Sequence, residues 1–197
     1  MNTLVVLAHP DLAASRVNAA LARAARSVEG VTVHELYAAY PEPLPRSLDV
    51  GREQQLLRTH DRIVLQFPFY WYSAPPLLKQ WLDEVFEHGF AYGSKGTALH
   101  GKSLRIATTI GSGAHEYRAD GMHGFPVPDL LRPFASTARL TGMRFQEPFL
   151  VHGTHVLTDE ELAGRADRYR RLLLGRPELE PEPGAGRVPG PLTVLRG

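Results

Sequence analysis

The sequence of 197 residues has no cysteine, no long apolar run and almost no net charge, and each absence excludes a class of protein. Without cysteine, disulfides, thiolate nucleophiles and Cys-ligated metal or iron–sulfur sites are excluded. No stretch approaches the roughly 18 apolar residues of a membrane-spanning helix, and the N-terminus lacks the basic start of a signal peptide. We therefore expect a cytoplasmic protein with no membrane anchor of its own. The 22 Lys and Arg against 21 Asp and Glu argue against nucleic acid as a partner.

Short apolar runs alternate with helical patterns over most of the chain. The runs expected as strands are residues 3–8, 31–36, 62–67, 104–109 and 144–151, and the patterns expected as helices are 15–28, 49–59, 75–86, 130–141 and 159–174. Residues 37–48 are rich in proline and are expected as a loop, while Thr158 and Glu161 have capping-box spacing at the last helix. Five strands alternating with five helices predict an α/β fold, a doubly wound parallel sheet with helices on both faces.

The last segment, 176–197, differs in composition from the rest. Nine of its 22 residues are Pro or Gly, so we expect a tail without a core of its own. The predicted organisation is one domain, 1–175, followed by this tail, 176–197. In a doubly wound sheet with right-handed crossovers, the loops after the first, third and fourth strands meet at the carboxyl edge.

The loop after the first expected strand combines polar side chains with the start of a helix. Ser15 stands at the N-cap position, and a helix N-terminus offers free N–H groups and the positive end of the helix dipole. His9, Arg16 and Asn18 add donors, so the loop suits a phosphate group. The loop contains neither a Walker A motif nor a G-x-G-x-x-G turn. The alternative interpretation is that Ser15 only caps the helix and His9 only packs.

The loops after the third and fourth strands favour a flat ligand. Residues 67–72 contain five aromatic side chains in six positions, which suit either a ring-shaped ligand, the core, or a subunit interface. The next loop, 108–115, adds Gly111 and Gly113, where the backbone can approach a ligand closely. This glycine loop is a weak signal by itself. Its expected position at the same sheet edge as the other two loops strengthens the case that it contacts a ligand.

Other kinds of chemistry find little support in the sequence. His152 and His155 are spaced as H-x-x-H, but no carboxylate or cysteine stands beside them, so no metal site is expected. No G-x-S-x-G motif is present, which argues against a serine hydrolase. Asp83, Glu84 and Glu87 share a helix and are expected to face water.

Several motifs together resemble one family. The run QFPFYWYSAPPLLKQWLDE at 66–84 resembles the flavodoxin-like NAD(P)H:quinone oxidoreductases. The likeness is closest to the ancillary proteins of glutathione-regulated potassium efflux systems, a branch also indicated by HGFAYGSKGTALHGK at 88–102. The opening VLAHP, the following SRVN and the T-T-x-G loop agree with it. The resemblance extends over almost the whole of the expected domain, and the aromatic run with its helix is its most specific part.

The resemblance implies a flavodoxin-like fold that binds FMN, with FAD as the alternative, and takes electrons from NAD(P)H. The residues implied to hold the phosphate are His9, Ser15, Arg16, Val17 and Asn18; those along the flavin ring are Phe69, Tyr70, Trp71 and Tyr72; and those at its pyrimidine edge are Thr108, Thr109, Ile110 and Gly111. Ile110 stands where the family usually has a second glycine, and it adds bulk there. With a one-residue insertion, Tyr117 and His123 align with a catalytic Tyr and His that stabilise developing charge and supply a proton.

The leading hypothesis is an FMN-dependent NAD(P)H:quinone oxidoreductase that transfers a hydride in two ping-pong half-reactions to a quinone or a similar flat electrophile. The resemblance also implies a homodimer, with Phe90 and Tyr92 near the shared pocket. One alternative is a regulatory subunit of a glutathione-gated potassium efflux antiporter, held at the inner membrane face through that partner. A third hypothesis is a one-electron carrier, which the net charge of +1 disfavours because flavodoxins are typically acidic.

Overall fold

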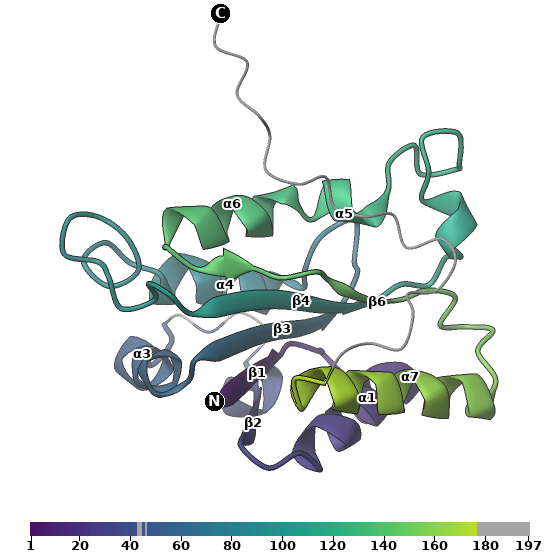
Figure 1. Ribbon diagram of the computed structural model, residues 1–197, viewed down its shortest axis with the longest axis horizontal. Coiled ribbons are helices and arrows are strands. Elements are labelled where there is room, and N and C mark those ends of the chain that lie inside the picture. Colours follow the sequence, from purple (N-terminus) through teal and green to yellow (C-terminus); the bar gives the residue numbers. More distant parts are fainter. Residues whose placement is uncertain (43–44, 46, 177–197) are drawn as a thin grey trace, which may run out of the picture.

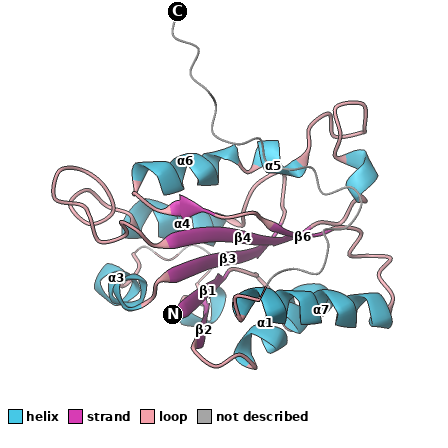
Figure 2. Ribbon diagram, viewed as in Figure 1, coloured by secondary structure: helices cyan, strands magenta, loops and turns pink. Residues whose placement is uncertain are grey.

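A computed structural model describes residues 1–42, 45 and 47–176, and its centre is a parallel sheet (Figures 1 and 2). The strand order is β2-β1-β3-β4-β5, with β6 also paired to β4, and every pairing is parallel. The strands are β1 (Thr3–Leu7), β2 (Val31–Glu35), β3 (Arg62–Pro68), β4 (Ser103–Thr109), β5 (Arg144–Phe145) and β6 (Phe149–Val151). The predicted α/β doubly wound sheet is confirmed.

The predicted fifth strand, 144–151, is wrong in one respect, because it is interrupted. Residues Arg144–Phe145 pair with the start of β4, and Phe149–Val151 pair with its end. Pro148 lies in the gap, and proline has no N–H to donate to a neighbouring strand. Two short strands, β5 and β6, therefore occupy the edge position and pair with β4 at its start and its end.

The sheet is covered on both faces, which explains the uninterrupted apolar runs of its central strands. Alternate residues face two separate cores: Leu4 and Ile63 belong to one, and Val5 and Val64 to the other. The helices are α1 (Arg16–Arg26), α2 (Leu36–Ala39), α3 (Val50–Thr59), α4 (Pro76–Val85), α5 (Val127–Leu130), α6 (Arg132–Leu140) and α7 (Asp159–Leu173), with a 3-10 turn at Ala114–Glu116. Helices α1 and α7 lie side by side on one face, and α4 and α6 cover the other (Figure 1).

Local sequence signals account for most helix boundaries and for two differences from the predicted elements. The expected capping box is present, since Thr158 accepts a hydrogen bond from the Glu161 N–H and the Glu161 side chain bonds back. The predicted helix 130–141 is instead two helices, α5 and α6, which divide at Leu131, just before Pro133. The predicted loop 37–48 contains the end of the short helix α2.

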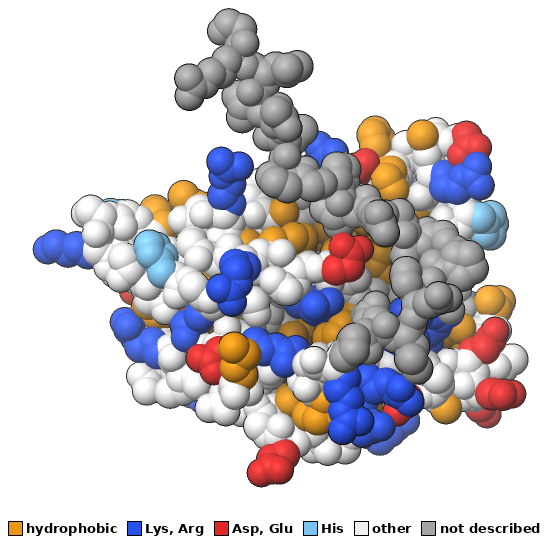
Figure 3. Space-filling view, viewed as in Figure 1, with side chains coloured by type: hydrophobic (Ala, Val, Ile, Leu, Met, Phe, Trp, Pro, Cys, Tyr) orange, Lys and Arg blue, Asp and Glu red, His pale blue; other side chains and the backbone are white. Residues whose placement is uncertain are grey.

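The described part of the chain contains no helix long and apolar enough to cross a membrane. Lys and Arg side chains are scattered over the face shown in Figure 3, with Asp and Glu side chains among them, in keeping with the balanced charge. The predicted tail, 176–197, lies outside the described residues except for Arg176.

The carboxyl ends of β1, β3 and β4 are adjacent, so the loops that follow them start side by side. The Ala8 N–H bonds to the Gln66 carbonyl, and the Phe69 N–H bonds to the Thr109 carbonyl. These two bonds extend the strand pairing by one residue into the loops after β1 and β3. The three loops singled out in the sequence therefore begin at one edge of the sheet.

Candidate functional site

The loop after β1 is a compact turn that delivers the chain to the N-terminus of α1. The His9 Nδ1 atom accepts a hydrogen bond from the Asp11 N–H at 3.1 Å, and Asp11 Oδ1 accepts one from the Ala14 N–H at 3.1 Å. Ser15 is the N-cap residue, and its Oγ accepts a hydrogen bond from the Asn18 N–H at 3.2 Å. Burial lowers the pKa of His9 despite the opposing charge of Asp11. The neutral ring therefore has its remaining N–H at Nε2, opposite the bonded Nδ1.

The three residues that follow Ser15 have different surroundings. The Arg16 guanidinium turns to α7, where it bonds to the Leu157 carbonyl and to Asp159, both at 2.6 Å. The Val17 side chain is buried in the core shared by α1 and α7. Asn18 is 2% exposed, and its side chain donates to Thr109 Oγ1 at 2.8 Å. The backbone N–H groups of Arg16 and Val17 have no hydrogen-bond partner among the described residues.

The aromatic loop after β3 contains a tight two-residue turn. The N–H of Tyr70 bonds to the Ser73 carbonyl at 3.0 Å, and the N–H of Ser73 bonds to the Tyr70 carbonyl at 2.9 Å. Between them, Trp71 and Tyr72 adopt positive φ angles of 47° and 63°. A turn with two left-handed central residues normally contains Asn and Gly, because bulky side chains are strained there by about 1–3 kcal/mol each.

The strained turn presents its side chains and its backbone to the outside. The Trp71 ring is 92% exposed, and Tyr70 and Tyr72 are each 44% exposed. No partner is found for the Trp71 and Tyr72 N–H groups within the described part of the chain. An arrangement that costs folding free energy and leaves two N–H groups and three rings available is typical of a binding site.

The loop after β4 is anchored to the core at its first residues. Thr108 Oγ1 donates to the Phe67 carbonyl at 2.9 Å, while Thr109 Oγ1 accepts from Asn18. Ile110 is 1% exposed and packs in the core, and its N–H bonds to the Val151 carbonyl at 2.8 Å. Its φ is not positive, so a side chain is tolerated here. The bulk of Ile110 is directed into the core, and the loop begins at Gly111.

Tyr117 and His123 lie together at the end of this loop, against the aromatic turn. Their rings stack with centroids 4.0 Å apart and planes at 20°. Phe69 contacts the Tyr117 ring edge-on at 6.1 Å, and Tyr72 contacts the His123 ring at 5.7 Å. Burial raises the pKa of the Tyr117 hydroxyl, and the neighbouring Tyr72 and Glu116 act in the same direction. The hydroxyl therefore keeps its proton at neutral pH.

Ser112 was not singled out from the sequence, yet it belongs to this cluster. Its Oγ lies 3.1 Å from His123 Nε2. The available signal was its position between Gly111 and Gly113, two residues whose missing side chains leave the loop backbone close to its surroundings. A Cβ at Gly113 would meet the His115 ring at 2.7 Å, and one at Gly111 would lie 3.0 Å from His155.

The remaining sequence expectations concern Phe90 and Tyr92 at a shared pocket and the histidines at 152 and 155. Phe90 is 3% exposed and packs in the core that contains Trp81, beneath Arg58, while its expected place at a pocket shared between two copies stays a prediction. Tyr92 is 37% exposed. No group of three or more His, Asp or Glu side chains suited to a metal ion occurs in the described residues, and this includes His152 and His155.

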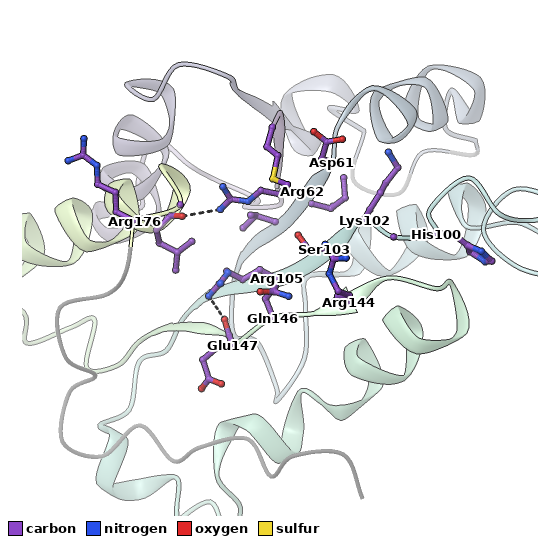
Figure 4. A pocket seen from close by; sticks show the side chains of 16 residues that line it. Asp61, Arg62, His100, Lys102, Ser103, Arg105, Arg144, Gln146, Glu147 and Arg176 are labelled. Atoms are coloured by element: carbon purple, nitrogen blue, oxygen red, sulfur yellow. Dashed lines mark hydrogen bonds between the residues drawn. The ribbon is translucent and has the colours of Figure 1, made fainter.

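A cavity of about 880 Å³ lies elsewhere, at the amino ends of β3 and β4 (Figure 4). Its cations bond to backbone carbonyls at the ends of elements. Arg62 bonds to the carbonyls of Leu172 and Leu173 at 2.9 Å each, and Lys102 bonds to those of Arg58 and His60 at 3.1 and 2.7 Å. Cations at helix C-termini stabilise the carbonyl end of the helix dipole, which gives Arg62 and Lys102 a structural role.

The comparisons with known proteins agree with the fold. The chain belongs to the family described as "Flavodoxin-like fold", whose model matches residues 1–173. It is 46% identical over 168 residues to "Uncharacterized NAD(P)H oxidoreductase YrkL" of Bacillus subtilis (strain 168), and the match covers 85% of this chain and 95% of that protein.

Two solved structures resemble the chain over most of its length. The general stress protein 14 of Treponema denticola, solved in complex with FMN, is 44% identical with a TM-score of 0.83, and the match covers 89% of this chain and 99% of that one. A protein of P. pentosaceus named NADPH-quinone reductase is 35% identical with a TM-score of 0.79, covering 88% and 98%. None of these three is named as part of a potassium efflux system, so the closer likeness to that branch stays an unsupported prediction.

Proposed function

We propose that this protein is an FMN-dependent NAD(P)H:quinone oxidoreductase. The observation that carries the proposal is the meeting of three loops at one sheet edge. Unpaired N–H groups of α1 lie after β1, a strained aromatic turn lies after β3, and the Tyr117–His123 pair follows β4. The similarity to an FMN complex and to proteins named NAD(P)H oxidoreductase and NADPH-quinone reductase supports it.

The start of α1 fits the phosphate of FMN. The Arg16 and Val17 N–H groups lack partners among the described residues, and the Ser15 hydroxyl and His9 lie on the same loop. A dianion at a helix N-terminus is stabilised by these donors and by the helix dipole. Arg16 contributes its backbone here, because its guanidinium is bound to α7. Asn18 contributes by fixing the first turn of α1 to β4 through Thr109.

The ring of FMN fits between the aromatic turn and the loop after β4. Phe69, Tyr70, Trp71 and Tyr72 would line one side of it, and the unpaired N–H groups of Trp71 and Tyr72 would face its polar edge. Thr108, Thr109, Ile110 and Gly111 would hold the loop at the pyrimidine edge, where the glycine backbone allows close approach. The flavin supplies the hydride chemistry, and the protein supplies binding and orientation.

Tyr117 and His123 are the proposed catalytic residues. The Tyr117 hydroxyl, kept protonated by its raised pKa, is a donor for negative charge that develops on reduction. The His123 side chain is 12% exposed and lies between Tyr117 and Tyr72 of the aromatic turn. It can therefore supply a proton to a reduced quinone bound beside that turn. The space between the aromatic turn and the loop after β4 is the proposed slot. NAD(P)H and the quinone would occupy it in turn, which gives ping-pong kinetics.

A homodimer would complete this site. Trp71 in the aromatic turn is 92% exposed, and Met122 and Phe125, which are close to His123 in the sequence, are 84% and 59% exposed. A second copy covering them would bury this surface and exclude water from the reaction. The functional unit is then two copies of the 1–175 domain. FMN is favoured over FAD because of the FMN complex of a relative.

The test is a titration of purified protein with FMN, followed by anaerobic addition of NADH or NADPH and then a benzoquinone. We expect flavin to bind, to lose its visible absorption with one of the two donors, and to recover it with the quinone. Binding without reduction would contradict the enzyme activity. No binding would contradict the cofactor assignment.

A further inference from the structure

His123 is held at both ring nitrogens by residues from two different loops. Tyr72 Oη lies 3.3 Å from His123 Nδ1, and Ser112 Oγ lies 3.1 Å from His123 Nε2. The flat side of the imidazole stacks on Tyr117. A partner at each ring nitrogen and a stacked ring on one side restrict the rotation of His123, and Tyr72 and Ser112 supply the two partners.

The surroundings also determine which nitrogen carries the hydrogen of the neutral ring. Glu116 Oε2 lies 4.0 Å from Nε2, and the negative charge of this carboxylate favours a hydrogen on that nitrogen. Tyr72 is on the opposite side, and a phenol is a good donor. Both arguments give the same arrangement, in which Tyr72 donates to Nδ1 and Nε2–H donates to Ser112 Oγ.

We infer that Tyr72 and Ser112 are positioning residues that hold His123 as the Nε2–H tautomer and leave the Ser112 hydroxyl hydrogen available to a bound acceptor. The inference rests on the proposed function for the identity of that acceptor, a carbonyl oxygen of a quinone or similar electrophile. Ser112 Oγ accepts from His123, and no acceptor for its own hydrogen is found among the described residues. Ser112 therefore ends a chain of donors that runs from Tyr72 through His123 to the loop at Gly111 and Gly113.

The strained turn places the Tyr72 hydroxyl beside His123. Tyr72 has a φ of 63°, which a tyrosine adopts only at a cost in free energy. In this conformation its ring contacts both Phe69 and His123, and its hydroxyl reaches Nδ1. A relaxed turn would move the hydroxyl away from the imidazole and release one side of the ring.

The decisive measurement is the tautomer of His123 in the protein without flavin. We would record nitrogen-15 NMR of histidine-labelled protein above the pH at which imidazole titrates, and assign His123 with the His123→Gln variant. We expect a protonated Nε2 in the wild type and in Ser112→Thr, which keeps a hydroxyl. We expect a shift toward mixed tautomers in Tyr72→Phe, which removes the donor to Nδ1, and a smaller shift in Ser112→Ala. The control is Ser73→Ala, an exposed serine of the neighbouring turn that does not contact His123. A wild-type signal from the Nδ1–H tautomer, or a Tyr72→Phe spectrum equal to the wild type, overturns the inference.

Kinetics separate this inference from the proposed function. In Ser112→Ala we expect kcat for the quinone to fall roughly tenfold with the Kd of FMN unchanged, because the variant loses both the hydroxyl offered to the acceptor and the partner of His123 Nε2, and neither contact is to FMN. Equal kcat values in the two proteins would contradict the positioning role. A wild type that shows the Nε2–H tautomer yet binds no FMN would overturn the proposed function and leave the geometry of His123 in place.

Discussion

Asn18 and Thr109, which are 91 residues apart in the sequence, are joined by a buried hydrogen bond of 2.8 Å from the amide nitrogen of Asn18 to the hydroxyl of Thr109. Gln66 donates in turn to the Asn18 carbonyl at 3.1 Å. One side chain from each of β3 and β4 thus fixes the first turn of α1. The bond thus connects the loop after β1 to the end of β4.

Replacing Asn18 with Ala removes this link. Because a buried hydroxyl loses its partner, we expect the free energy of unfolding to fall by about 1–3 kcal/mol. The FMN affinity should fall as well, because the start of α1 is no longer fixed to β4. Urea denaturation and flavin titration measure the two effects. In the control variant Ser15→Ala, loss of the N-cap should cost about 1 kcal/mol. If Asn18→Ala lost FMN with no change in stability, Asn18 would be a direct ligand instead.

The change Ile110→Gly tests whether the Ile110 side chain packs in the core or restricts the loop after β4. Its burial in the core predicts a loss of about 3–5 kcal/mol in the free energy of unfolding, because a cavity replaces the side chain. In Ile110→Val the same quantity should fall by only about 0.5–1.5 kcal/mol. Thermal or urea unfolding of both variants gives the comparison. A stable Ile110→Gly variant with tighter FMN binding would mean that the side chain restricts the flavin loop.

The change Trp71→Gly separates stability from function at the strained turn. Glycine adopts a φ of 47° without strain, and the lost ring is almost fully exposed, so the free energy of unfolding should stay the same or rise by up to about 1 kcal/mol. The Kd of FMN should increase because one wall of the slot is removed. The control is Trp81→Ala in the buried core, which should lose about 3–5 kcal/mol. A clear loss of stability in Trp71→Gly would show that the turn is not strained.

The sequence was sufficient to predict the order of strands and helices because the central strands are apolar on both faces and the helices carry clear start signals. It did not predict the break at Pro148, since periodicity alone does not show where an edge strand loses its partner. In the site, the loops were predictable from their place after β1, β3 and β4. The side-chain partners were not: Arg16 turning to Asp159, Ile110 turning inward and Ser112 meeting His123 all depend on tertiary contacts.

Helix α3 contains a buried carboxylate that the sequence analysis did not single out. Glu53 of α3 has no exposed surface, and its oxygens accept hydrogen bonds from Tyr40 and from Trp81 at 2.8 Å each. His34 Nε2 lies 2.9 Å from the same carboxylate. Burial by itself would raise the pKa of Glu53, but the hydrogen bonds from His34, Trp81 and Tyr40 and the charge of His34 together lower it. Glu53 is therefore ionised in the folded protein at neutral pH.

A lowered pKa makes the contribution of Glu53 to stability depend on pH in one direction. Its contribution is complete above the pKa of an unfolded glutamate, about 4.3, and is lost as the pH falls through the lower folded value. At pH 7, Glu53→Gln should reduce the free energy of unfolding by about 1.5–3 kcal/mol, because hydrogen bonds to a charged group are lost. Urea unfolding at intervals from pH 7 to pH 3 should show the wild type and this variant converging at the acid end. The exposed control Glu29→Gln should follow the wild type throughout. Parallel curves for Glu53→Gln and the wild type would mean that Glu53 titrates at the same pH in the folded and the unfolded protein.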